Sequence, residues 1–200
     1  DYYASRGLGD VYKRQEEMID CVNAFYEGMV QRSEEMKQHP NYKTGENYAY
    51  LGLPPCFLIF DEYVAFFEML GTKESVGLLS QLKKIVMLGR QAGYFLIVAC
   101  QRPDAKYFSD GIRDNFNFRV GLGRISELGY GMLFGSDVKK QFFQKRIKGR
   151  GYCDVGTSVI SEFYTPLVPK GHDFLQTIGS LAQARQDGTA TCEAKGDGTD

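Results

Sequence analysis

The segment CFLIFDE, residues Cys56–Glu62, is an apolar run that ends in two adjacent carboxylates. The pair Pro54-Pro55 precedes it and interrupts regular structure. A short, continuous apolar run is typical of a strand in a parallel sheet, where both faces are covered. We therefore expect residues 56–60 to form a buried central strand whose carboxyl end carries Asp61 and Glu62.

The two carboxylates at this strand end point to a functional site. Charged groups where a buried strand emerges are costly unless they meet a cation, a water or hydrogen-bond donors. Parallel sheets bind their ligands at the carboxyl ends of their strands. The pattern matches a Walker B motif, in which Asp61 faces a nucleotide-bound Mg²⁺ and Glu62 faces the attacking water. The alternative is a surface Asp-Glu pair that caps a helix beginning near Tyr63.

A second apolar run, Tyr94–Cys100, ends in Gln101-Arg102-Pro103. Residues 72–91 between the two runs have helical periodicity, and Gly93 can cap the helix at its C-terminus. A strand, a helix and a strand form a βαβ unit, whose right-handed crossover makes the strands parallel. We therefore expect both polar strand ends at one edge of the sheet. Glutamine there can donate to a phosphate oxygen and accept from water; alternatively, residues 101–103 only end the strand.

The remaining segments predict one domain between two tails. Residues 1–15 resemble a translated sequencing adaptor and are expected to be a non-native or disordered tail, and residues 175–200 a disordered tail rich in small and polar residues. Residues 16–174 form the domain. The elements expected in it are helices at 16–38, 63–70, 127–133 and 137–144, a loop at 39–55, a strand at 118–123, and a hairpin of residues 151–156 and 158–166.

Composition limits the classes of partner. The chain has 24 basic and 25 acidic residues and a net charge of −1, so no global charge attracts nucleic acid or membrane. Its five cysteines lie apart and form no C-x-x-C pair, which indicates a reducing compartment. No apolar run has the length of a transmembrane helix or a signal peptide. We expect a cytoplasmic domain whose membrane anchor, if present, lies outside these residues.

One segment, residues 139–150, is strongly basic and contains no acidic residue. Its cations are Lys139, Lys140, Lys145, Arg146, Lys148 and Arg150. A basic segment with aromatic residues can bind the phosphate backbone of DNA. Three other interpretations remain open: a solvated surface, a contact with a neighbouring subunit or its nucleotide, and inward packing of Phe142 and Phe143.

Four segments occur in a characteristic order: Leu58–Tyr63, Gly89–Gly93, Ala99–Pro103 and Ile112–Val120. They resemble the Walker B strand, the helix closing in Ala-Gly, the Thr-Gln-Arg-Pro strand end and the Ile-x-x-Asn-x-x-x-Arg segment of the FtsK/SpoIIIE DNA-pumping ATPases and related conjugative coupling proteins. The resemblance covers residues 16–174. Cys100 stands where that family usually has threonine.

The resemblance implies an α/β fold of the P-loop NTPase (RecA-like) type, with a mainly parallel sheet flanked by helices. It implies ATP and Mg²⁺ as cofactors, with Asp61 at the metal and Asp61, Gln101 and Arg102 at the nucleotide. The implied catalytic residues are Asp61, Glu62, Gln101 and Arg119.

Arg119 is expected to act as an arginine finger on the neighbouring subunit's nucleotide. Arginine suits this role because it stays charged and donates in a planar fork. Two alternatives remain: the Arg119 stem packs beside Phe118 while its head caps a carbonyl, or Arg124 takes the role between subunits.

The family has a Walker A loop upstream, whereas this chain contains no G-x-x-x-x-G-K-[ST] motif and no Gly-Lys dipeptide. We therefore expect the C-terminal half of a motor domain, inactive as an ATPase by itself. The resemblance implies a homo-oligomeric ring, a hexamer, that moves double-stranded DNA in conjugation or in chromosome partition at cell division. It also implies a membrane anchor in the full-length bacterial protein. The helices and strand ends are rich in Phe and Tyr and resemble those of relatives from mobile elements, which favours conjugation. A protein-secretion ATPase and a nucleotide-independent binding or structural fragment are alternatives.

Overall fold

The computed structural model describes residues 14–103, 106, 108, 110–136, 138, 141–142, 147–157 and 159–186. The chain divides into two compact units. The first is formed by residues 14–166, and the second includes the described residues 167–186. The predicted tail of residues 1–15 lies almost entirely outside the described residues; Arg14 is the N-cap of the first helix, which begins at Gln15.

The predicted βαβ unit is confirmed. Strands β1 (Cys56–Phe60) and β2 (Tyr94–Val98) pair in parallel, and helix α3 (Thr72–Ala92) connects them. The helix ends at Gly93, whose φ of 78° lies in the left-handed region that glycine adopts without strain. Gly89 is also required, because a Cβ there would collide with the backbone carbonyl of Tyr94. Helix and strand therefore pack closely where the crossover ends.

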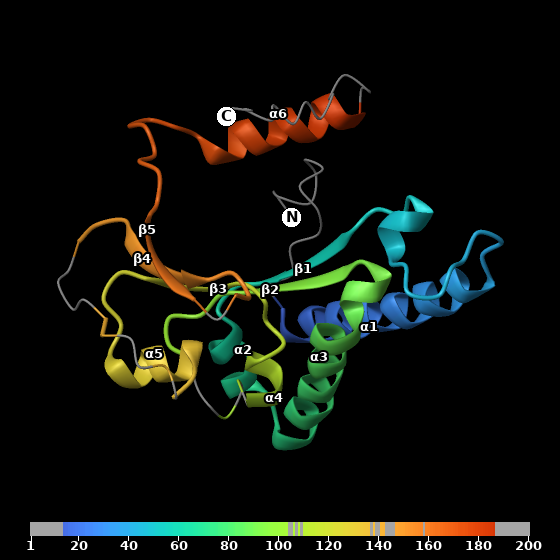
Figure 1. The fold of residues 1–200 in the computed structure, drawn as a ribbon, viewed down its shortest axis with the longest axis horizontal. Helices are drawn as coiled ribbons and strands as arrows, with labels where there is room; N and C mark the ends of the chain where they lie inside the picture. Colours follow the sequence, from blue (N-terminus) through green and yellow to red (C-terminus); the bar gives the residue numbers. More distant parts are fainter. Residues whose placement is uncertain are drawn as a thin grey trace. The chain divides into compact units, whose positions relative to one another are not determined.

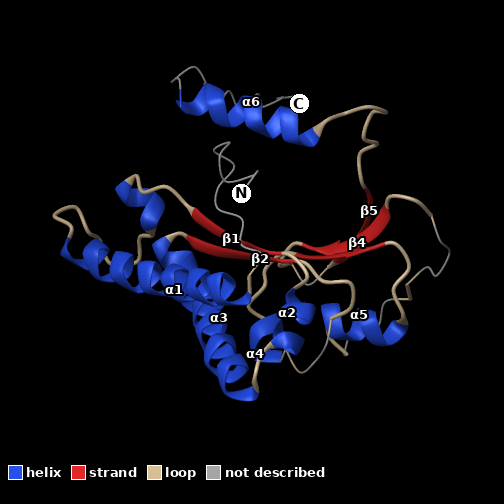
Figure 2. Cartoon of the chain, turned by 180° about the vertical axis from the view of Figure 1, so that it is seen from behind, coloured by secondary structure: helices blue, strands red, loops and turns tan. Residues whose placement is uncertain are grey.

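Helices cover one side of the strands in residues 14–166. In both views of the chain, α1 (Gln15–Gln38), α2 (Tyr63–Met69), α3, α4 (Asp110–Arg113) and α5 (Glu127–Phe134) lie on the same side of the sheets (Figures 1 and 2). Apolar residues at helical spacing on α1 and α3 meet Phe60 in the main core. The fully buried members from these two helices are Val22, Met29, Met36, Leu78, Leu82, Ile85 and Ala92.

The opposite face of β1 and β2 is exposed. Phe57 is 56% exposed, Ile59 71% and Ile97 48%. The prediction that β1 is covered on both faces is therefore wrong for the described part of the chain. Its burial alternates because the α-helices described in residues 14–166 pack on the face that carries Phe60. On the opposite face, Tyr48 contacts Phe95, which pairs with Phe57.

Three strands form a second, antiparallel sheet in the order β3-β4-β5. They are β3 (Arg119–Leu122), β4 (Arg150–Asp154) and β5 (Ile160–Tyr164), which confirms the predicted strand and hairpin. Helix α5 packs against this sheet, and Ser126 caps the helix by accepting a hydrogen bond from the backbone N–H of Gly129. Among the described strands, β1 and β2 are therefore the parallel pair.

Two segments differ from their predictions. Of the predicted helix at 137–144, the structure describes Val138, Gln141 and Phe142, none of which is helical. Residues Phe174–Gln186 form helix α6, although the sequence predicts a disordered tail from residue 175. The Asp173 carboxylate accepts a hydrogen bond from the Gln176 N–H, which supplies an N-terminal cap that the composition argument ignored. The rest of that predicted tail, residues 187–200, is outside the described residues.

The structure also contains a short 3-10 helix, η2 (Tyr48–Leu51), in the expected loop before β1. Among the described helices, none combines the length and apolar character needed to cross a bilayer.

Candidate functional site

The polar ends of β1 and β2 lie side by side. The Ala99 N–H donates to the Phe60 carbonyl at 2.9 Å, and the Tyr63 N–H donates to the Ala99 carbonyl at 3.0 Å. These bonds continue the pairing past both strands and place Gln101 beside Glu62, where Gln101 Nε2 donates to Glu62 Oε1 at 3.2 Å. The predicted meeting of the two strand ends at one edge is confirmed.

Glu62 has an unusual backbone conformation. Among the described residues other than glycine, it alone has a positive φ, with φ 51° and ψ 43°. Such a conformation costs about 1–3 kcal/mol and is found preferentially at functional sites. Glu62 stands at the N-cap position of α2, yet its side chain makes no capping hydrogen bond. The carboxylate is therefore not used as the helix cap that the alternative interpretation proposed.

The backbone around Glu62 is held from both sides. Before it, Asp61 Oδ1 accepts a hydrogen bond from the Glu62 N–H at 3.0 Å. After it, Tyr63 is 1% exposed, and its ring lies 4.8 Å from that of Phe67 and 4.7 Å from that of Phe108, measured between centroids. Burial raises the pKa of Tyr63, so this residue remains a neutral anchor. The Glu62 backbone is thus fixed while its side chain is exposed to solvent.

The exposed carboxylates of Asp61 and Glu62 fit the requirements of a nucleotide-bound Mg²⁺. This ion prefers oxygen ligands and usually takes one or two carboxylates together with substrate phosphates and waters. Among the described residues, no group of three or more histidine, cysteine, aspartate or glutamate side chains could hold a metal ion. A magnesium ion at Asp61 would therefore need most of its ligands from a nucleotide and water.

Cys100 is half-buried and follows the end of β2. Burial raises the pKa of its thiol, and the negative charge of Glu62 raises it further. The thiol therefore stays neutral at pH 7 and adds no negative charge beside Glu62. Arg102, the next predicted nucleotide-binding residue after Gln101, is exposed at the same strand end.

Arg119 begins β3 in the second sheet and is held by an ion pair. Its Nη2 lies 2.5 Å from Asp154 Oδ2, with side-chain exposures of 17% and 3% for the two residues. Its Nη1 also donates to the carbonyl of Leu133 at 3.4 Å. This geometry resembles the alternative in which the arginine head caps a carbonyl. A role between subunits stays a prediction and requires the pair with Asp154 to open; the rival Arg124 is exposed.

Asp154 was not recognised from the sequence. Its importance depends on the antiparallel register, which sets Arg119 opposite Asp154. A signal was present, since one expected strand contains an acidic residue and another a basic residue, but the spacing does not say which strands pair.

Four of the six predicted DNA-contacting residues, Lys139, Lys140, Lys145 and Arg146, lie outside the described residues. Of the others, Lys148 is exposed, whereas Arg150 is 2% exposed, with its guanidinium 5.7 Å from the centre of the Tyr152 ring. Contact between Arg150 and DNA would require this side chain to leave its buried position. The prediction for this segment therefore depends on its other cations.

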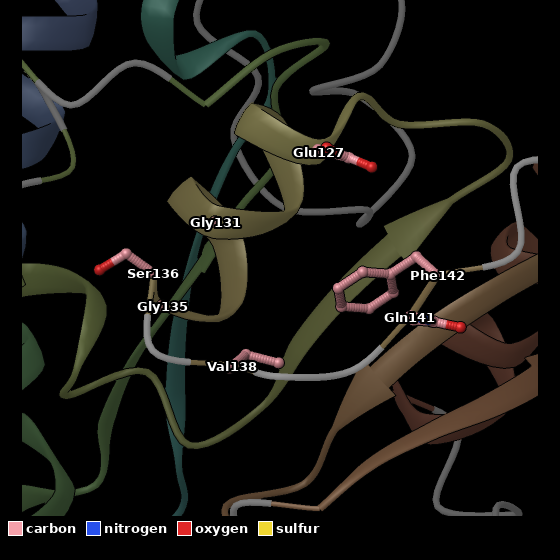
Figure 3. A pocket seen from close by; sticks show the side chains of 7 residues that line it. All are labelled: Glu127, Gly131, Gly135, Ser136, Val138, Gln141 and Phe142. Atoms are coloured by element: carbon pink, nitrogen blue, oxygen red, sulfur yellow. The ribbon is translucent and has the colours of Figure 1, made fainter.

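A pocket of about 460 Å³ lies between α5 and the segment after it (Figure 3). It is lined by Glu127, Gly131, Gly135, Ser136, Val138, Gln141 and Phe142. Glu127 is the one charged residue among the described lining residues, and its carboxylate would repel a phosphate. Phe142 packs inward as one alternative predicted, with its ring 3.9 Å from that of Tyr130 between centroids.

The βαβ unit with its acidic edge and flanking helices defines the class: the fold is that of a P-loop ATPase domain. In agreement, the chain resembles the pCW3 conjugation coupling protein TcpA in its monomer form with ATPγS, with a TM-score of 0.64 and 16% identity over 86% of this chain and 51% of that one. It also resembles the cytoplasmic domain of the Thermomonospora curvata Type VII secretion ATPase EccC, with a TM-score of 0.58 and 18% identity over 86% of this chain and 21% of that one.

Sequence comparison identifies the family. The chain is 53% identical over 190 residues to the FtsK domain-containing protein YdcQ of Bacillus subtilis strain 168, an alignment that covers 95% of this chain and 39% of YdcQ. No family model matches the chain. The protein belongs to the FtsK/SpoIIIE family of ATPases. It spans less than half the length of this curated relative.

Proposed function

We propose that this chain is the C-terminal part of an ATP-driven motor domain that moves double-stranded DNA. The relatives support a role in the translocase family. The observation that carries the proposal is the arrangement of Asp61, Glu62 and Gln101 at one edge of a parallel pair, with Glu62 in a strained backbone conformation and its carboxylate exposed. A water-activating carboxylate needs both a fixed position and access to the substrate.

Each residue at this edge has a proposed task. Glu62 orients and activates the attacking water, and Asp61 holds the nucleotide-bound Mg²⁺, which neutralises charge on the phosphates. Arg102, exposed beside Gln101, lies where it can meet the nucleotide. The phosphate-cradling Walker A loop is absent from these 200 residues and is proposed to come from another part of the protein.

The exposed face of β1 and β2 supports this division of the motor domain. Phe57, Ile59 and Ile97 together form an apolar surface on strands whose other face is the main core. Contiguous apolar surface of this kind usually marks an interface. We propose that the part of the protein carrying the Walker A loop covers this face and completes the sheet. The chain covers 39% of YdcQ, which leaves ample length for such a part in a protein of that size.

The proposed substrate is DNA in conjugative transfer, moved by a hexameric ring anchored to a bacterial membrane by another segment. The likeness to a conjugation coupling protein supports this choice. The likeness to a secretion ATPase favours a second candidate, protein export by the same kind of motor. Stimulation of ATP hydrolysis separates the two, because double-stranded DNA should stimulate only a DNA translocase.

Asp61→Ala tests the site in the full-length protein that contains this chain. We expect weaker Mg²⁺-dependent ATP binding and loss of most DNA-stimulated hydrolysis, because the metal loses its carboxylate contact. The measurements are ATP affinity with and without Mg²⁺ and the hydrolysis rate with DNA. Asp20→Ala, which removes an exposed carboxylate from α1, is the matched control and should behave as wild type. Equal behaviour of the two variants would refute the metal assignment.

The proposed arginine finger can be tested by mixing subunits. Arg119→Lys keeps a cation beside Asp154 but loses the planar fork. If Arg119 acts on the neighbouring nucleotide, mixing this variant with Glu62→Gln subunits should restore part of the ATPase activity, because some interfaces then combine two intact halves. The contrary result is no ATPase recovery in rings shown to contain both Arg119→Lys and Glu62→Gln subunits. If rings that mix Arg124→Ala with Glu62→Gln subunits then do recover activity, the role belongs to Arg124.

A further inference from the structure

We infer that Gln101 is a positioning residue, which acts by orienting the Glu62 carboxylate and not by contacting the γ-phosphate itself. This inference rests on the proposed ATPase function. It replaces the simpler expectation that the glutamine amide senses the nucleotide directly. The difference matters because a sensor and a positioning residue respond differently when Glu62 is removed.

The hydrogen bond between these side chains is the first observation. Gln101 Nε2 donates to Glu62 Oε1 at 3.2 Å across the two strand ends. The amide therefore has an acceptor within the protein, and that acceptor is the proposed water-activating group. The amide has two donors, so a direct contact with the γ-phosphate would have to use the second donor or displace this bond.

The second observation is that everything else about Glu62 is already fixed. Its backbone is held by the Asp61 side chain, by the bond from the Tyr63 N–H to Ala99, and by the Phe66 N–H, which donates to the Glu62 carbonyl at 3.2 Å. What remains free is the side chain, since glutamate has three rotatable bonds and loses up to about 1.5–2 kcal/mol of rotamer entropy when ordered. Gln101 is the described neighbour whose side chain bonds its carboxylate.

Fold stability does not account for this bond. Both side chains are exposed, and exposed polar pairs contribute little, typically below about 1 kcal/mol. A bond of this kind can still select one orientation of a carboxylate, and orientation of a catalytic group is worth much more to the rate than to the fold. The bond therefore suits a positioning role.

A double-mutant cycle in the full-length protein tests the inference. The variants are Gln101→Ala, Glu62→Gln and the combination, with ATPase rates followed by single-turnover release of labelled phosphate and affinity measured for ATPγS. Gln31→Ala is the matched control, because Gln31 Nε2 donates to Glu35 Oε1 at 2.7 Å in an exposed amide–carboxylate pair on α1. It should leave rate and affinity unchanged.

If Gln101 is a positioning residue, Gln101→Ala should lower kcat by about 10-fold or more, since mispositioned catalytic groups commonly cost that much. Its affinity for ATPγS should stay within about twofold of wild type. In the Glu62→Gln background, Gln101→Ala should lower the residual rate by less than about twofold, because the group on which it acts has lost its function. Gln101→Glu should be at least as slow as Gln101→Ala, because it places a second negative charge beside Glu62.

Two results would overturn the inference. Rate losses that multiply in the combined variant would show that Gln101 acts independently of Glu62. A matching loss of ATPγS affinity in Gln101→Ala would show direct contact with the nucleotide. If wild-type protein hydrolyses no ATP, or Glu62→Gln keeps the wild-type rate, the proposed function itself fails and the inference fails with it.

Discussion

Full-length protein with Glu62→Gln is expected to bind ATP normally and to lose about 10²–10⁴-fold in turnover, the range for removal of a general base. The amide is isosteric with the carboxylate and retains an oxygen that can accept from Gln101, so the local hydrogen bond survives. Only the ability to take a proton from water is removed. Steady-state hydrolysis and binding of ATPγS measure the two parts separately.

Glu68→Gln is the control for this experiment. Glu68 is an exposed carboxylate on α2, the helix that begins directly after Glu62. Its replacement changes the net charge by the same amount but leaves the strand ends intact, so turnover should match wild type. Wild-type turnover in Glu62→Gln would rule out Glu62 as the group that activates water.

The second large effect is expected on stability. Asp154→Ala should destabilise the fold by about 3–5 kcal/mol, because removing one partner of a buried pair leaves an uncompensated charge. Asp154 is 3% exposed and pairs with Arg119, and its Oδ1 also accepts from the Gly156 N–H at 2.9 Å. Chemical unfolding monitored by circular dichroism should show the transition at lower denaturant.

Asp114→Ala is the comparison for this loss. Asp114 also pairs with an arginine, Arg113, at 3.1 Å, but its side chain is 61% exposed, so the change should cost less than about 1 kcal/mol. The double replacement Arg119→Met with Asp154→Leu removes both charges and should recover much of the lost stability. An Asp154→Ala protein as stable as Asp114→Ala would show that the buried pair contributes little.

The βαβ unit and its site could be predicted because each step uses local sequence. Helical spacing over 72–91, two short apolar runs and the right-handed crossover together require parallel strands, and parallel strands bring Glu62 and Gln101 to one edge. Once both residues lie at one edge, the amide of Gln101 is close enough to donate a hydrogen bond to the Glu62 carboxylate. Local patterning was therefore sufficient to place the side chains of the proposed catalytic edge next to one another.

Other features depend on interactions that local sequence does not specify. Phe57 and Ile59 look like buried strand residues, but burial of their face depends on what else packs there. The ion pair between Arg119 and Asp154 depends on an antiparallel register across a separation of 35 residues. The conformation of Glu62 was also unpredictable, because positive φ at a residue other than glycine follows from its surroundings.

A structure of the full-length protein with Mg²⁺ and ATPγS tests the central claim most directly, namely that the acidic edge of β1 is the hydrolytic site. We predict the Asp61 carboxylate in the Mg²⁺ coordination sphere and the Glu62 carboxylate within hydrogen-bonding reach, about 2.6–3.2 Å, of a water facing the γ-phosphate. Nucleotide bound away from this edge, with Asp61 and Glu62 still exposed to solvent, would contradict the account.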